Sequence, residues 1–262
     1  MSDKPAATPV PAATILLLRD GTAGLEVFMV KRHHQVDFVS GALVFPGGKV
    51  DATDREEALA EYCDGAQSMD EARRALMVCA IREAFEESGI LLARDGSSGA
   101  FVGSERLERL AQYRKALDRH EIGMAQLLRR ENLRLALDQL ALFAHWITPA
   151  NMPKRFDTLF FAAPSPVGHA GSHDGRESVD SVWIGPEQAI ADRKNWNIVF
   201  PTKLNLMKLA GSRSVADAMA AARASQPLTV TPWVEQSAEG PILRIREDAG
   251  YAQTWVKLKE AL

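Results

Sequence analysis

The feature that most restricts what this chain can fold into is the stretch 82–90, which reads Arg-Glu-Ala-Phe-Glu-Glu-Ser-Gly-Ile. Its glutamates stand at 83, 86 and 87, a spacing of i, i+3 and i+4. In an α-helix these positions share one face, one turn above the other. Gly89 is the residue type that often ends a helix in a left-handed conformation. The stretch therefore predicts the last turns of a helix with three carboxylates on one face.

Three carboxylates at the end of one helix are electrostatically unfavourable by themselves. Like charges repel, and acidic side chains near a helix C-terminus also oppose the helix dipole. Mg²⁺ and Mn²⁺ prefer oxygen ligands and would offset both effects. Arg82 could hold one of the carboxylates through a charge-assisted fork. The alternative is an acidic helix end exposed to solvent, and the three glutamates alone do not decide between the two.

A sharp turn upstream of the helix belongs to the same motif. A short apolar strand over 42–45 leads into Pro46-Gly47-Gly48. We expect these glycines to serve either a positive φ angle or a close approach of the backbone to another group. The two stretches together resemble the Nudix hydrolases. Residues 82–90 match the second half of the Nudix box, Arg-Glu-U-x-Glu-Glu-x-Gly-U with U apolar, and 47–51 resemble its opening.

This resemblance implies a fold and a set of functional residues. The implied fold belongs to the α/β class and is an α/β/α sandwich with a mixed sheet, here with helical insertions. The implied ligands of Mg²⁺ or Mn²⁺ are Glu83, Glu86, Glu87 and the carbonyl of Gly47, and Arg82 joins the glutamates as a catalytic residue. Bound metal would acidify a water molecule that attacks phosphorus. Which glutamate acts as the base stays open, because the family does not use a single position.

The match departs from the family pattern in its first half. Counting from Gly48, Asp54 stands where the pattern has glutamate. Residues 55–81 separate Asp54 from Arg82, which is 27 residues where the pattern has seven. The excess predicts an insertion within the box, placed at 55–75. Asp54 is a candidate for an extra acid or base, and Glu56 or Glu57 could replace it.

The rest of the chain is expected to form a single domain over 12–262 behind a disordered N-terminus at 1–11. Apolar runs at 12–18 and 25–30 predict a hairpin of buried strands. The segment 95–135 predicts a helical insertion, with one helix over 105–117 capped by Ser104 and another over 121–130. The core-facing positions of the main helix are expected at Met77, Ala80, Ile81, Ala84 and Phe85. Further strands are expected at 140–147, 156–162 and 179–184, helices after Pro186, Pro201 and Ser214, and a terminal hairpin from 228–234 and 242–245.

Other residues are candidates for substrate contact. Arg32 ends the predicted hairpin and could meet substrate phosphates, or lie on the solvated surface. The backbone of Gly48 and the basic pair Lys154 and Arg155 are further candidates. A glycine-rich loop at 168–175 is placed at the mouth of the site. The resemblance implies an extra acid or metal ligand near there, which Glu177 would supply.

The segment 145–158 resembles the coenzyme A diphosphatase branch with an enlarged box. The extended signature of coenzyme A diphosphatases is nevertheless broken, because Asp37 and Val39 stand where it has arginine and histidine. On the resemblance of 145–158 to that branch, coenzyme A or an acyl derivative is the first substrate hypothesis. ADP-ribose, dinucleotides and other nucleoside diphosphate compounds remain alternatives, as does a non-catalytic ligand sensor.

Composition limits the partners of such a protein. The net charge of −3 favours neither nucleic acid nor a membrane surface, and we expect a small-molecule substrate. Cys63 and Cys79 are the only cysteines, which favours a reducing cytoplasm over a disulfide framework. The helical insertion could also serve as a contact in a homodimer.

Overall fold

A mixed sheet forms the centre of the computed structural model, which describes residues 7–33, 41–175 and 178–261. Its strands run in the order β10-β2-β1-β9-β8-β11, and β3 and β4 attach to β2 and β1. β1 pairs in parallel with β9 and antiparallel with β2 and β4. The bounds are β1 Val10–Gly21, β2 Gly24–Arg32, β3 Leu43–Val44, β4 Gly47–Lys49, β8 Ala141–Ile147, β9 Phe156–Pro164, β10 Ser178–Ile184 and β11 Thr229–Val230.

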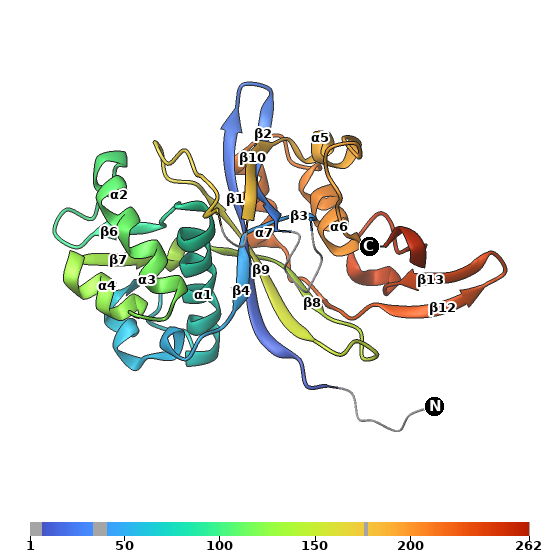
Figure 1. The fold of residues 1–262 in the computed structure, drawn as a ribbon, viewed down its shortest axis with the longest axis horizontal. Coiled ribbons are helices and arrows are strands. Elements are labelled where there is room, and N and C mark those ends of the chain that lie inside the picture. The colour runs from blue at the N-terminus through green and yellow to red at the C-terminus, as the bar shows by residue number, and fades with distance from the viewer. Residues whose placement is uncertain (1–6, 34–40, 176–177, 262) are drawn as a thin grey trace.

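The first strand lies in the middle of this sheet, between β2 and β9 (Figure 1). Residues 15–18 are buried on both faces, which explains why they form an unbroken apolar run. The expectation of disorder over 1–11 is wrong at its end, because β1 already begins at Val10. The amide of Val10 donates to the carbonyl of Arg155 at 2.9 Å. The segment just before β9 therefore pairs with the start of β1. Residues 1–6 lie outside the described part.

The main helix, α1 Glu71–Ser88, packs against β1 and β4. Asp70 caps its start by accepting a hydrogen bond from the amide of Arg73 at 2.7 Å. Gly89 ends it with φ 70°, and its amide donates to the carbonyl of Phe85, as predicted. The five predicted core positions are all buried. Val78 and Cys79 are buried as well, because further layers cover the side of the helix that faces away from the sheet.

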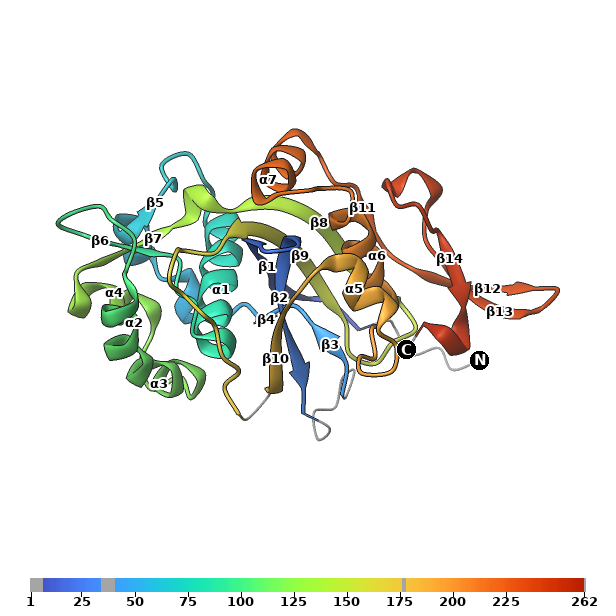
Figure 2. The same cartoon turned by 90° about the horizontal axis from the view of Figure 1, so that it is seen from above.

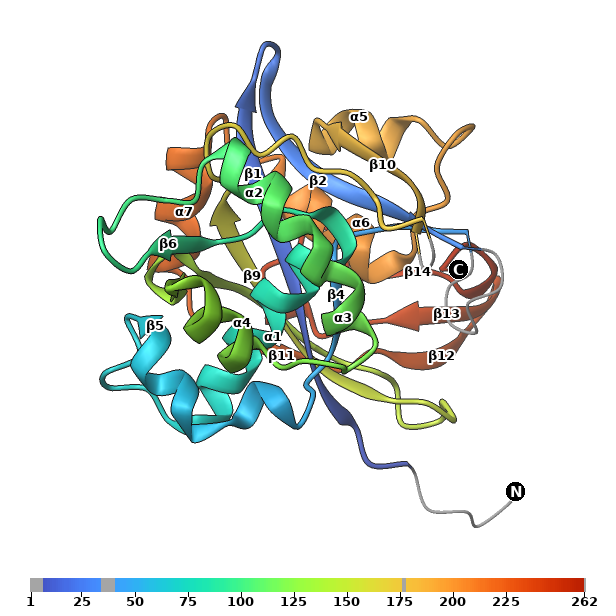
Figure 3. The ribbon, with the colours of Figure 1, turned by 60° about the vertical axis from the view of Figure 1, so that its left-hand side comes forward.

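Those further layers are the two insertions, which share one hydrophobic core with α1. Figure 3 shows the helices of the second insertion in front of α1. The first insertion contains 3-10 helices at Thr53–Arg55 and Glu57–Tyr62, and the second contains α2 Ser104–Leu110, a 3-10 turn at Ala111–Tyr113, α3 Arg114–Asp118 and α4 Met124–Glu131. Strands β5 Cys63–Asp64, β6 Ala93–Asp95 and β7 Leu133–Ala136 join the two in a small sheet of order β5-β7-β6.

The helices of the second insertion differ from the prediction in their boundaries. A single helix was expected over 105–117 with a Ser104 cap. Gly103 is the N-cap instead, without a side-chain hydrogen bond, and a 3-10 turn separates α2 from α3. The next helix begins at Met124 and not at Glu121, after Gly123 in an extended conformation. Leu110 and Leu117 are both buried in the structure, on either side of the 3-10 turn.

The opposite face of the sheet carries a second core. It is covered by α5 Pro186–Ala191, α6 Phe200–Leu209 and α7 Val215–Ala224, which begin close to the predicted positions. The terminal hairpin is a three-stranded sheet of β12 Trp233–Ser237, β13 Gly240–Arg244 and β14 Trp255–Lys257. Figure 2 shows α1 and α6 on opposite sides of the central strands, so the predicted α/β/α arrangement is observed. Across the described ranges, no helix combines the length and apolar character needed to cross a membrane.

Candidate functional site

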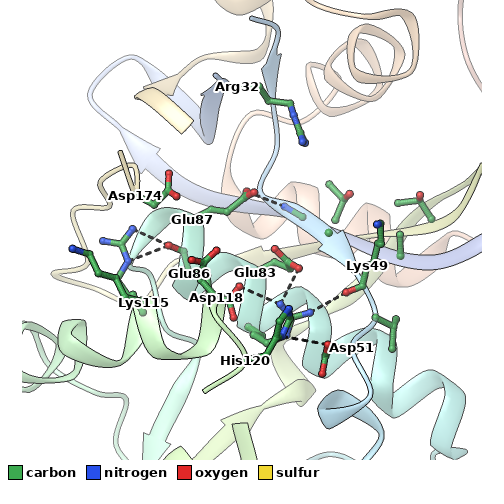
Figure 4. Close-up of a pocket in the computed structure, with 18 of the residues that line it drawn as sticks. Arg32, Lys49, Asp51, Glu83, Glu86, Glu87, Lys115, Asp118, His120 and Asp174 are labelled. Atoms are coloured by element: carbon green, nitrogen blue, oxygen red, sulfur yellow. Dashed lines mark hydrogen bonds and ion pairs between the residues drawn. The ribbon is translucent and has the colours of Figure 1, made fainter. Parts of the chain in front are cut away.

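A pocket of about 890 Å³ lies at the C-terminal half of α1. The helix, the β4 turn, the edge of β1 and β9, the second insertion and the loop before β10 all contribute to its walls. Figure 4 shows Glu83, Glu86 and Glu87 along α1, with Arg32 on the far side of the pocket. The predicted site residues among the described lining residues are Arg32, Gly47, Gly48, Arg82, Glu83, Glu86 and Glu87.

Arg82 is the buried centre of this site. Its Nε and Nη2 donate to the two carboxylate oxygens of Asp54, both at 2.9 Å, and Nη1 donates to Glu83 at 2.9 Å and Glu86 at 3.1 Å. Nη2 also donates to the carbonyl of Lys49 at 2.9 Å. Burial by itself disfavours the charge, but the hydrogen bonds that Arg82 donates to Asp54 and the charge of Glu83 outweigh burial and raise the pKa of Arg82. Arg82 therefore stays charged and joins the β4 turn to the acidic face.

Asp54 stands where the family pattern has glutamate, and its side chain is 0% exposed. Besides Arg82, it accepts a hydrogen bond from the amide of Asp51 at 2.8 Å. Asp54 is not among the described residues that line the pocket. This geometry lets Asp54 hold Arg82 in place, and its role as an extra acid or base remains a prediction. Glu56 and Glu57 are exposed and likewise absent from the described lining.

The three glutamates are not an exposed acidic helix end. Glu86 and Glu87 are only 8% and 7% exposed, although both line the pocket. Burial raises the pKa of Glu86 to about 8, against the lowering effect of Arg82. Glu86 Oε1 is buried without a hydrogen-bond partner among the described residues. Glu87 Oε2 accepts a hydrogen bond from the amide of Gly47 at 3.1 Å.

The two glycines of the turn are required by close approach and not by positive φ angles. A Cβ atom on Gly48 would lie 2.2 Å from Glu83 Oε1, and one on Gly47 would lie 2.6 Å from the carbonyl oxygen of Ala13. Both distances are too short for any side chain. The turn can therefore touch the carboxylate face of α1 only with glycine at these positions.

The donor set fits a hard divalent cation, although the side chains are not gathered around one point. In the part of the chain that is described, no three His, Cys, Asp or Glu side chains stand together as a metal site. Arg82 engages Glu83 and Glu86, and the Gly47 amide engages Glu87. The buried, unpartnered Oε1 of Glu86 is nevertheless the kind of atom that a cation would satisfy.

The other predicted substrate contacts divide into two groups. Arg32 lines the pocket, and its Nε is buried without a partner among the described residues. Lys154 and Arg155 are not among the described lining residues. Arg155 instead donates to the carbonyls of Thr148 at 3.0 Å and Ala7 at 2.8 Å, which ties the β8–β9 connection to the N-terminal segment. Glu177 lies outside the described residues.

Sequence reasoning missed several residues of the pocket wall. Arg114, Lys115, Asp118 and His120 come from the second insertion, and Asp174 comes from the loop at 168–175, which does border the site as expected. His120 has a left-handed φ of 54°, and its Nδ1 lies 3.3 Å from Asp51 Oδ2. Figure 4 shows this pair across one end of the pocket. No local pattern marks these residues, because long-range packing brings them to the site.

Known proteins share these features. The model of the family described as NUDT19 Nudix domain matches residues 64–206. Acyl-coenzyme A diphosphatase NUDT19 of Xenopus laevis is 28% identical over 222 residues, which cover 70% of this chain and 58% of that protein. Putative nudix hydrolase 7 of Caenorhabditis elegans is 30% identical over 179 residues, which cover 68% of this chain and 52% of that protein. This chain thus spans between half and three fifths of the length of these relatives.

A solved structure extends the similarity to the fold. The crystal structure of a NUDIX hydrolase from Alicyclobacillus acidocaldarius matches with a TM-score of 0.66 and 27% sequence identity. The match covers 82% of this chain and 96% of that one. The similarity therefore includes most of the sheet and helices that build the pocket.

Proposed function

Because this chain belongs to the NUDT19 Nudix domain family of Nudix hydrolases, we propose that it is a metal-dependent hydrolase of a diphosphate bond in a nucleoside diphosphate-linked compound. The family assignment confirms the predicted resemblance, and the similarity of solved structures confirms the predicted Nudix sandwich. One observation carries the proposal. The last turns of α1 place Glu83, Glu86 and Glu87 on one pocket wall, against a glycine turn, with a buried Glu86 oxygen left unpartnered.

The residues of the chain would divide the work as follows. Glu83, Glu86, Glu87 and the Gly47 carbonyl would hold Mg²⁺ or Mn²⁺. Such a cation, when bound, neutralises phosphate oxygens and acidifies water. Arg82, held by Asp54, keeps Glu83 and Glu86 in place. Arg32 lies on the opposite wall, where its guanidinium would meet a phosphate oxygen.

The acid that the family uses from the later part of the fold is assigned here to Asp174. Glu177, the expected residue, lies outside the described residues, and Asp174, three positions earlier, lines the pocket. A carboxylate there faces the substrate space from the side opposite the glycine turn (Figure 4). We assign it the role of an additional base or metal ligand, beside one glutamate of α1.

The substrate proposal is coenzyme A or an acyl-coenzyme A. It is supported by similarity to proteins named acyl-coenzyme A diphosphatase, in Xenopus laevis and also in Homo sapiens at 26% identity. Basic groups line both sides of the pocket, with Arg32 and Lys49 on one and Lys115 on the other. These charges suit a substrate with several phosphates.

The test is phosphate release, coupled to a phosphatase, from coenzyme A, acetyl-coenzyme A, ADP-ribose, NADH and diadenosine compounds. Each would be assayed with Mg²⁺, with Mn²⁺ and with EDTA. The expected result is metal-dependent cleavage of the coenzyme A compounds. Preference for ADP-ribose or dinucleotides would redirect the substrate assignment. Cleavage of none, by folded protein that binds Mn²⁺, would favour a ligand sensor.

Glu87→Gln gives the matched test of mechanism. It keeps the shape of the side chain but removes its charge, so we expect kcat to fall about 10²–10³-fold. Glu71→Gln is the control on the same helix, since Glu71 lies exposed in its first turn. Wild-type turnover of Glu87→Gln with saturating metal would remove Glu87 from the mechanism.

A further inference from the structure

The second insertion reaches the catalytic face through one arginine. Arg114 opens α3 and lines the pocket. Its Nε and Nη2 donate to the carbonyl of Glu86 at 3.2 and 3.0 Å. Nη2 also donates to the carbonyl of Ser172 at 3.0 Å. One guanidinium therefore connects the insertion, the last turn of α1 and the loop that carries Asp174.

The surroundings of Arg114 are shaped to admit this side chain. A Cβ atom on Gly89 would lie 3.1 Å from its Nη1, so the glycine that ends α1 also leaves room for the guanidinium. The loop is held at the same point by a second hydrogen bond, because the amide of Ser172 donates to the carbonyl of Ser88 at 2.8 Å. The loop is therefore attached to the C-terminal end of α1 at two points. One is the direct hydrogen bond from Ser172 to Ser88, and the other is the bridge through Arg114 to the carbonyl of Glu86.

The charge of Arg114 also answers an electrostatic problem of the site. Glu86 and Glu87 stand at the negative end of the α1 dipole, where acidic residues are unfavourable. A cation bound to the carbonyls of the last turn offsets that dipole. Arg114 makes this contact from outside the helix, and its half-buried charge also interacts with that of Asp174.

We propose that Arg114 is a positioning residue, by which the second insertion holds both the glutamate-bearing turn of α1 and the Asp174 loop around the pocket. The second insertion then contributes to the geometry of the site. The catalytic consequence of this role rests on the proposed function, whereas the structural consequence does not. Arg114 acts on the reaction through Glu86, Glu87 and Asp174.

The deciding variant is Arg114→Lys, which keeps the positive charge but cannot bond both carbonyls with one planar fork. Arg106→Lys is the matched control. Arg106 also joins a carboxylate to a carbonyl within the insertion, those of Asp95 and Glu131, but it is not among the described lining residues. Thermal melting of both variants would establish that they are folded.

Three readouts separate positioning from simple stability. For Arg114→Lys we expect kcat to fall about 10- to 100-fold with KM little changed, since displacement of catalytic groups acts on the chemical step. We expect Mn²⁺ affinity, measured by electron paramagnetic resonance, to fall about tenfold. Hydrogen exchange of the Ser172 amide should accelerate. Arg106→Lys should change none of the three.

The opposite results would overturn the proposal. A rise in KM alone would make Arg114 a substrate contact. Unchanged exchange at Ser172 and unchanged Mn²⁺ affinity would remove the positioning role. Equal losses in both variants would reduce it to general stability. If wild-type protein cleaves no compound of the panel, the proposed function fails, while the exchange and Mn²⁺ comparisons still decide the role of Arg114.

Discussion

Replacing Asp54 by asparagine tests the buried centre of the site most directly. The carboxylate is fully buried and accepts three hydrogen bonds, two from Arg82 and one from the Asp51 amide. Asparagine keeps one oxygen but turns an NH₂ donor toward a group that is itself a donor. The variant thus loses a charge-assisted hydrogen bond and leaves a buried donor unpaired.

The magnitude follows from these contacts. Removing one partner of a buried ion pair costs about 3–5 kcal/mol. Arg82 keeps Glu83 and Glu86 as partners, so we expect the lower end, about 3 kcal/mol less free energy of unfolding. At about 2–4 °C per kcal/mol this corresponds to about 6–12 °C in Tm. The measurement is urea unfolding, followed by tryptophan fluorescence, together with calorimetry.

Asp64→Asn is the matched control. Asp64 also accepts from two arginines, Arg94 at 2.9 Å and Arg134 at 2.7 Å, but its side chain is 28% exposed. Solvent screens this pair, so we expect a loss of no more than about 1 kcal/mol. Equal effects of the two substitutions, or wild-type stability of Asp54→Asn, would refute the reasoning. Asp54→Glu should also destabilise, by about 1–3 kcal/mol, because it adds a methylene group to a fully buried site.

Three further predictions address the glycine turn, the phosphate contact and pH. Gly48→Ala should displace the Glu83 carboxylate, 2.2 Å from the added Cβ, and lower kcat about tenfold or more in steady-state assays. Arg32→Met should raise KM about tenfold with little change in kcat, since the pocket would lose the guanidinium proposed to meet a phosphate. Burial lowers the pKa of His169, against its hydrogen bond to the Val102 carbonyl, so unfolding takes up a proton. Stability should therefore fall as pH drops below about 6.5, and His169→Gln should flatten that slope in unfolding titrations.

Each of these three has a control in the chain. Gly103→Ala should be tolerated, because no atom lies within 4 Å of the added Cβ and its φ of −79° suits any residue. Lys154→Met should leave KM unchanged, since Lys154 is not among the described lining residues. His173→Gln should keep the wild-type pH slope, because His173 is exposed. Parallel effects of a variant and its control would contradict the assigned cause.

The acidic helix is the part of the site that sequence reasoning predicts well. Asp70, the three glutamates and Gly89 all act within one helix, and a helix relates residues three and four apart regardless of what surrounds it. The C-terminal cap and the shared face of the glutamates were therefore readable from spacing, whereas the structure showed the N-cap role of Asp70. The apolar stripe from Met77 to Phe85 likewise reported the side that packs on the sheet.

Other features needed the tertiary structure. The pairing of Asp54 with Arg82 spans 28 positions and crosses the first insertion. Arg114 lies 28 positions beyond Glu86, and Asp174 lies beyond three further strands. Lys154 and Arg155 were predicted as phosphate ligands from their residue type, but they are not among the described residues that line the pocket. Residue type does not determine which side of the fold a loop residue lies on. The same holds for the boundaries of α2 and α3.

The division has a physical reason. Hydrogen bonding within a helix and the alternation of buried positions are set by near neighbours, so sequence by itself determined the helix, its C-terminal cap, its acidic face and the family. Burial of Glu86, the choice between close approach and positive φ at Gly48, and the use of the insertion as a pocket wall depend on which segments pack together. Only the tertiary structure decided these, because their free energies arise from contacts between distant parts of the chain.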